Sequence, residues 1–167
     1  MELLFFYLVA LVAILSAFLV VKCKNPVNSA ISLVMTFFCL AIFYVMLYAP
    51  FMAAVQVLVY AGAIMVLILF VIMLLNLGPE MMERFQHGVI GGAIVAGIVM
   101  VQAVMFVNRG NTAGISGDIT RERVLAEGHM ELIGMKLFTE FMLPFQIAGI
   151  LLLIAIVGAL VLAKKEV

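Results

Sequence analysis

Charge is scarce in this sequence of 167 residues. Charged residues make up 11% of it, against roughly 25% in an ordinary soluble domain, while 68% of the residues are hydrophobic. The formal net charge is zero, and the basic residues are scattered rather than clustered into a patch that could bind nucleic acid. The composition therefore excludes a soluble globular domain and a nucleic-acid-binding surface, and it predicts an integral membrane protein.

Cysteine is almost absent as well. Cys23 and Cys39 are the only two, and they have no CxxC spacing, so the sequence predicts neither an iron-sulfur cluster nor a zinc site. The 13 methionines are spread along the apolar runs without a clustered spacing, which favours a packing role over soft-metal binding. We expect this chain to hold no catalytic residue, no metal site and no bound cofactor.

Long hydrophobic runs take up most of the chain. Each has about 20 residues or more, enough for a helix to cross the roughly 30 Å hydrocarbon core of a bilayer. Asn25-Pro26 is typical of a helix start, because Asn caps free amides and Pro needs no donor in the first turn. The sequence predicts one all-α membrane domain over 1–167, with five transmembrane helices at about 2–21, 26–47, 51–75, 88–107 and 142–163.

A more polar segment, 108–140, interrupts these runs. Its charges alternate with apolar residues and it contains several glycines, a pattern that predicts a polar surface loop with a short amphipathic helix. Charge in the short connections indicates the orientation, since Lys22 and Lys24 follow the first run and Lys164 and Lys165 follow the last. By the positive-inside rule, we expect the N-terminus outside and the C-terminus in the cytoplasm.

Lys, Arg, Asp, Glu and His are missing from the interior of every predicted span. A chain that carried protons or ions alone would need such groups at membrane depth. The spans offer neutral polar side chains instead, among them Gln56, Tyr60 and Gln146, which can order water and donate hydrogen bonds but do not exchange a proton near neutral pH. We therefore expect the chain to shape a proton path whose carboxylates belong to neighbouring subunits.

Small and polar residues mark one face of the third predicted helix. Gln56 and Tyr60 are four residues apart, which places both on one face of an α-helix, and Ala61-Gly62-Ala63 lets a neighbouring backbone come close. The fourth helix carries a similar stripe of small residues, formed by Gly88, Gly92 and Ala96. Both patterns predict close helix packing.

Hydroxyl side chains on the second predicted helix leave two alternatives open. Ser29, Ser32 and Thr36 share one side of that helix. Each hydroxyl could donate to the carbonyl one turn earlier in its own helix, or it could hydrogen-bond to a partner helix.

Three stretches of the chain resemble one protein family. They are VQVLVYAGAIMVLILFVIMLLNL over 55–77, NPVNSA over 25–30, and Leu137-Phe138 followed by LPFQIA over 143–148. These are similar to the third transmembrane helix, the entry into the second and the approach to the last helix of subunit J of proton-pumping NADH:quinone oxidoreductase, respiratory complex I. The mitochondrial counterpart of that family is subunit 6.

The resemblance implies a role for the third helix. In the family this helix has a π-bulge near its tyrosine-glycine element, and a change at the bulge gates a water path between the quinone site and the antiporter-like subunits. Carried over, this implicates Tyr60, Gly62 and Val66, with Gln56 beside them. Gln56 and Gln146 occupy positions where some family members have glutamate, so two carboxylates of the family pattern are missing.

The resemblance also implies an assembly. NADH, FMN, the iron-sulfur clusters and the quinone are expected on partner subunits, and the partners are other membrane-arm subunits, resembling A, H, K and N, together with membrane lipid. The implied location is the inner membrane of a bacterium, as a multi-pass subunit of a hetero-oligomer.

Two other functions remain as alternatives. A purely structural scaffold of the same complex shares every compositional feature with the gating subunit, and only Gln56, Tyr60 and Gly62 distinguish the two. A self-contained small transporter is less favoured, because the spans lack intramembrane charge and their odd number shows no inverted repeat.

Overall fold

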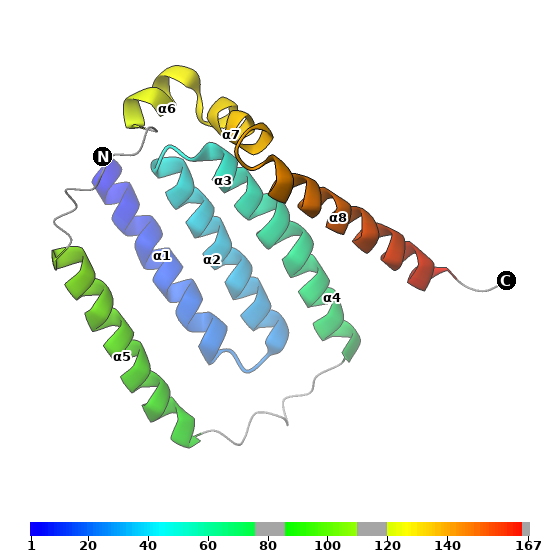
Figure 1. The fold of residues 1–167 in the computed structure, drawn as a ribbon. Coiled ribbons are helices and arrows are strands. Elements are labelled where there is room, and N and C mark those ends of the chain that lie inside the picture. Colours follow the sequence, from blue (N-terminus) through cyan, green and yellow to red (C-terminus); the bar gives the residue numbers. More distant parts are fainter. Residues whose placement is uncertain (76–85, 110–119, 165–167) are drawn as a thin grey trace. The chain divides into compact units, whose positions relative to one another are not determined.

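The computed structural model describes residues 1–75, 86–109 and 120–164. At 86–90, 108–109 and 121 it describes the backbone but not the side chains. Every regular element in these ranges is a helix (Figure 1). The chain divides into two units, Met1–Gly117 and Asp118–Val167. We describe each unit by itself.

The first two helices form an antiparallel pair. Helix α1 (Glu2–Lys22) packs along α2 (Pro26–Met46), and the connection between them is only three residues long (Figure 1). Asn25 starts α2, because its side-chain oxygen accepts a hydrogen bond from the Val27 amide at 2.9 Å and Pro26 follows in the first turn. At the far end of the pair, the rings of Phe6 and Phe43 lie 5.4 Å apart.

A tight turn joins α2 to the third span. The amide of Ala49 donates to the Tyr44 carbonyl at 2.9 Å and that of Tyr48 to the Val45 carbonyl at 3.0 Å, the pair of bonds that closes a Schellman motif. Tyr48 has a φ of 59°, in the left-handed region where such motifs usually place glycine. The turn folds the third span back against α2.

The third span is a continuous helix with three geometries. It begins as α3 (Pro50–Val55), continues as a π-helix, η1 (Gln56–Ile64), and ends as α4 (Met65–Leu75). All three segments pack on α2, so α2 lies between α1 and the third span (Figure 1). The resemblance implied a bulge near Tyr60 and Gly62, and the π-helix contains both residues, but it is nine residues long, begins at Gln56 and ends before Val66.

Among the described residues, four helices are long and apolar enough to cross a membrane: Glu2–Lys22, Pro26–Met46, Pro50–Leu75 and Met142–Ala163. Helix α5 (Gln86–Arg109) covers the predicted fourth span, and its described apolar part, Gly91–Val107, is shorter than these four. The described chain is therefore an all-helical membrane protein.

The second unit contains three helices. They are α6 (Arg121–Glu127), α7 (His129–Phe138) and α8 (Met142–Ala163). Thr120 caps α6 by accepting a hydrogen bond from the Arg123 amide at 3.3 Å, and Gly128, with φ 90°, separates α6 from α7. The sequence predicted one short amphipathic helix in 108–140, and the structure places two helices there, because Gly128 breaks the helical run.

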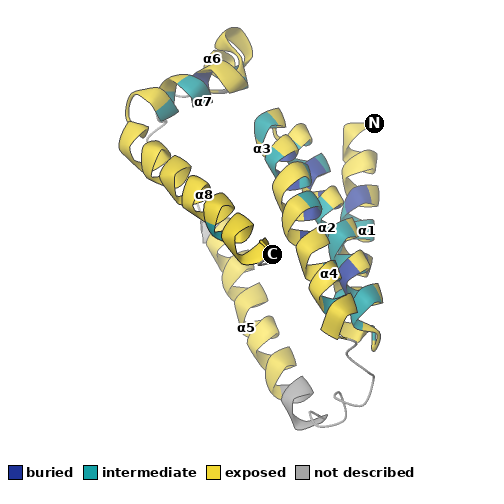
Figure 2. Ribbon diagram, turned by 90° about the vertical axis from the view of Figure 1, so that its right-hand side faces the viewer, coloured by how far each residue is buried: buried dark blue, intermediate teal, exposed yellow. Residues whose placement is uncertain are grey.

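Burial is concentrated where α1 and the third span pack on α2. Figure 2 shows buried positions on α1, α2 and the third span. Most of these buried residues are small, which lets the helices come close. By contrast, α8 has no buried residue. Large apolar side chains are exposed along all the candidate spans, as expected for surfaces that face lipid or partner chains.

Candidate functional site

The candidate site is the π-helical turn in the middle of the third span. The buried residues along this span are Ala53, Gln56, Ala61 and Met65, with spacings of three, five and four residues. Five residues of a regular α-helix turn through about 500°, which would direct the fifth residue away from the starting face. The wider π-helical turn takes up the additional residue and returns Ala61 to the face that packs on α2.

Backbone hydrogen bonds show the change of geometry directly. Where η1 begins, the Gln56 amide donates to the Met52 carbonyl, four residues earlier. Where it ends, the Met65 amide donates to the Tyr60 carbonyl, five residues earlier. The shift from four to five residues is the defining feature of a π-helix.

Gly62 lies within this turn, where a side chain would be crowded. A Cβ atom at position 62 would stand 3.2 Å from the Val57 carbonyl oxygen, closer than an ordinary van der Waals contact. The crowding atom belongs to the same helix. The sequence indicated that Gly62 makes room for a neighbouring helix, and the structure adds that Gly62 relieves crowding inside its own π-helical turn.

Gln56 and Tyr60 differ sharply in burial, although both were expected on one face of an α-helix. The side chain of Gln56 is 8% exposed, whereas Tyr60 is 45% exposed. The Tyr60 ring packs edge-on against Phe37 of α2, with ring centroids 5.9 Å apart. Because η1 is π-helical, the residue that shares the buried face with Gln56 is Ala61, and Tyr60 lies at the edge of the interface.

The chemistry available at this site is hydrogen bonding. The Gln56 amide can donate and accept, and the Tyr60 hydroxyl can do both, while the surrounding side chains of the span are apolar. Within the described part of the chain, no group of three or more His, Cys, Asp or Glu side chains could hold a metal ion. The site can therefore bind and orient water or a polar group of a neighbour.

The other candidate residues lie apart from this turn. Val66 is 63% exposed and belongs to α4, one residue after Met65, whose amide makes the π-helical bond. Gly92 and Ala96 are exposed on α5, and a Cβ atom at Gly92 would meet no atom within 4 Å. The side-chain surroundings of Gly88 lie outside the described residues. Gln146 is exposed on α8, in the second unit.

The hydroxyl groups of α2 follow both alternatives that the sequence left open. Ser32 donates to the Asn28 carbonyl at 2.9 Å and Thr36 to the Ser32 carbonyl at 3.0 Å, each within its own helix. Ser29 instead donates to the carbonyl of Val20, and so connects α2 to α1 near the turn between them.

Sequence reasoning missed the most buried residue of the span. Met65 is 1% exposed and anchors the start of α4 against α2, although a methionine in an apolar run gives no signal of its own. The spacing of four residues from Ala61 to Met65 could have indicated that Met65 is buried. That inference requires knowing that η1 contains an additional residue between Gln56 and Ala61.

Comparison with known proteins decides the family. The family model described as NADH-ubiquinone/plastoquinone oxidoreductase chain 6 matches residues 16–162. This chain belongs to that family. It is similar to the chloroplastic NAD(P)H-quinone oxidoreductase subunit 6 of Physcomitrium patens, with 35% identity over 96% of this chain and 83% of the relative. The subunit 6 of Staurastrum punctulatum, also chloroplastic, is 37% identical over 84% of this chain and 78% of its own length.

Membership of the chain 6 family confirms the resemblance drawn from 55–77 and makes this chain one subunit of a larger oxidoreductase. A subunit of this kind is a member of a hetero-oligomer. The match begins within α1 and ends within α8, so it includes the whole of the π-helical turn.

Proposed function

We propose that this chain is a membrane-arm subunit of a redox-driven proton pump, in which it lines and gates a water path between the quinone site and the antiporter-like subunits. The observation that carries the proposal is the π-helix η1, which places Gly62 beside the Val57 carbonyl and the buried Gln56 amide at the start of the same turn. Membership of the chain 6 family supports the redox-driven complex.

A π-helix can act as a switch because it has one residue more per turn than an α-helix needs. If η1 became α-helical, the residues beyond it would rotate by about 100°, the angle of one residue. The fourth residue after Gln56 would then replace the fifth on the face that packs against α2. Tyr60 would take the place of Ala61, and Ile64 that of Met65.

This exchange gives the two states different hydrogen-bonding chemistry. In the π-helical state the buried face presents Gln56 and the methyl group of Ala61. In the α-helical state it presents the Gln56 amide and the Tyr60 hydroxyl together, four residues apart. Two polar groups side by side can hold a chain of water molecules that one amide and a methyl group cannot.

The proton-carrying carboxylates of this path belong to partner subunits. Support comes from the sequence between Leu3 and Leu75, where the only charged residues are Lys22 and Lys24. NADH, FMN, the iron-sulfur clusters and the quinone are likewise assigned to partner subunits. The partners in the membrane resemble subunits A, H, K and N. The proposed location is the inner membrane of a bacterium, with five spans.

The test is the variant Gly62→Leu in the assembled complex. A bulky side chain beside the Val57 carbonyl disfavours the π-helical state, and overpacking of this kind costs about 1–3 kcal/mol, comparable to the difference between two conformers of a switch. We expect proton pumping per quinone reduced to fall while donor oxidation with an artificial acceptor is retained.

Ala63→Leu is the matched control, because it adds the same side chain to an exposed position of the same turn. If Gly62→Leu assembles and pumps at the unmodified ratio, the chain is a structural scaffold of the complex and does not gate the path.

A further inference from the structure

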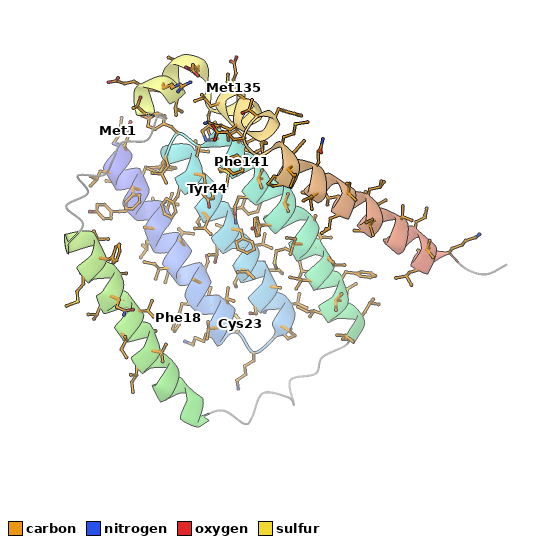
Figure 3. All side chains as sticks on the ribbon, viewed as in Figure 1. Met1, Phe18, Cys23, Tyr44, Met135 and Phe141 are labelled. Carbon is orange, nitrogen blue, oxygen red and sulfur yellow. The ribbon has the colours of Figure 1, made fainter. Side chains whose placement is uncertain are left out.

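Helices α1, α2 and α4 line a partly open apolar cavity, which shares only Met65 with the face that the gating proposal uses. Its volume is about 260 Å³, and its lining comes from the end of α1, the start of α2 and the inner face of α4. The cavity exists because α1 and α4 both pack on α2 but, within the described residues, not on each other. Cys23, which lines it, marks the end of α1 nearest the turn to α2 (Figure 3).

The lining has almost no hydrogen-bonding capacity to offer a polar ligand. Val20, Ala30, Met65 and Ile72 contribute apolar surface. The hydroxyl of Ser29 also lines the cavity, but it already donates to the Val20 carbonyl. The volume is below the roughly 300–1,000 Å³ of pockets for drug-sized ligands, so the space suits a narrow hydrocarbon chain.

Positive charge surrounds the end of the helices where this cavity lies. Lys22 and Lys24 flank Cys23, and both are exposed. The N-terminus of α2, which begins beside Asn25, adds the positive end of a helix dipole. A ligand with a hydrocarbon chain and a negatively charged head would match both the cavity and its surroundings.

We propose that this cavity binds one acyl chain of an anionic phospholipid, whose phosphate contacts Lys22 and Lys24. Lysines close to the membrane surface favour anionic lipids over neutral ones, and a phosphatidylcholine headgroup would gain less from this pair because its choline cation offsets the charge of its phosphate. The lipid fills the space between α1 and α4 and fastens both helices to the start of α2.

The experiment uses the assembled complex in neutral detergent with a phosphatidylglycerol analogue that carries a photoreactive group in its acyl chain. We expect labelling of peptides that contain Ala30, Met65 or Ile72. Unlabelled phosphatidylglycerol should compete at least tenfold better than phosphatidylcholine with the same acyl chains. The double variant Lys22→Gln with Lys24→Gln should bring that preference close to one, since each lysine near the surface contributes about fivefold.

Matched variants keep the result specific. Lys136→Gln with Lys164→Gln removes the same charge elsewhere and should leave the preference unchanged. Ala30→Leu fills the cavity and should reduce labelling, whereas Ala17→Leu adds the same bulk at an exposed position of α1 and should not. If Ala30→Leu fails to assemble, the lysine variants still decide the question.

Three results would overturn the proposal. The first is equal competition by phosphatidylcholine or by a neutral quinone, which would make the charge irrelevant. The second is labelling that avoids the cavity peptides. The third is a protein adduct formed in the assembled complex by a photoreactive residue at position 72, which would show that a partner helix fills the space.

Discussion

Gly62 lies five residues after Val57, and a Cβ atom on it would approach the Val57 carbonyl oxygen to 3.2 Å. In an α-helix the carbonyl aligned with residue 62 would be that of Leu58, four residues back. The contact therefore belongs to the π-helical form, and it makes position 62 a place where the two forms can be separated by substitution.

Gly62→Ala should shift the turn toward α geometry. The added methyl crowds the Val57 carbonyl only in the π-helical form, and alanine favours an α-helix over glycine by about 1 kcal/mol. We expect the ratio of α-helical to π-helical complexes to rise at least about fivefold, as measured by classifying particles in electron cryomicroscopy. Gly97→Ala, which adds a methyl into open space, is the control. An unchanged ratio in Gly62→Ala would show that the glycine does not set the geometry.

Gln56→Met should separate packing from water binding. Methionine has a similar volume, so the buried position should tolerate it at a cost below about 1.5 kcal/mol, and the complex should assemble. Proton pumping per quinone reduced should fall, because the amide that orients water is gone. Gln102→Met, at an exposed position of α5, should leave pumping unchanged. Normal pumping by Gln56→Met would show that Gln56 contributes packing and that its amide has no role in pumping.

Tyr60→Phe should have a smaller effect than Gly62→Leu. It keeps the ring that packs edge-on against Phe37, so the stability of the helix pair should change little, whereas Tyr60→Leu should lose about 0.5–1.5 kcal/mol of aromatic pairing. The unfolding midpoints of the two variants report the contribution of the ring to stability. Proton pumping by Tyr60→Phe reports the contribution of the hydroxyl to function. If Tyr60→Phe abolishes pumping, the hydroxyl is essential and water does not replace it.

Ser29→Ala should weaken the contact between α1 and α2. Its hydroxyl donates to the Val20 carbonyl across the helix pair, and such bonds in membranes contribute about 0.6 kcal/mol on average. Ser32→Ala removes a bond within α2 and should cost less. Reversible unfolding in mixed micelles measures the difference, and an equal loss in both variants would argue against the inter-helix bond.

Reporter fusions test the orientation. Fusions after Lys24 and at the C-terminus should both read cytoplasmic if there are five spans with the N-terminus outside, because Lys22, Lys24 and Lys164 then lie on the side that retains positive charge. A periplasmic reading at either point would change the span number or the orientation.

The ends of the helices could be predicted from sequence because the signals for them are local. Asn25 and Pro26 start α2 through a cap and a fixed φ, and both act on their own backbone. Long apolar runs identified the membrane helices, since a bilayer requires about 20 apolar residues whatever the neighbours are. The break at Gly128 was overlooked, although its cause is equally local.

The chain's own sequence also indicated where the candidate site lies, through Gln56, Tyr60 and Gly62. Which of these residues faces α2 was decided only by the tertiary structure. A spacing of four residues gives one face in an α-helix, but η1 contains an additional residue, so Ala61 and Met65 are buried while Tyr60 is 45% exposed. Apolar side chains surround the whole span, so the sequence has no hydrophobic periodicity that could locate the additional residue. The contact with α2 determines its position, because only one side of the span packs on α2.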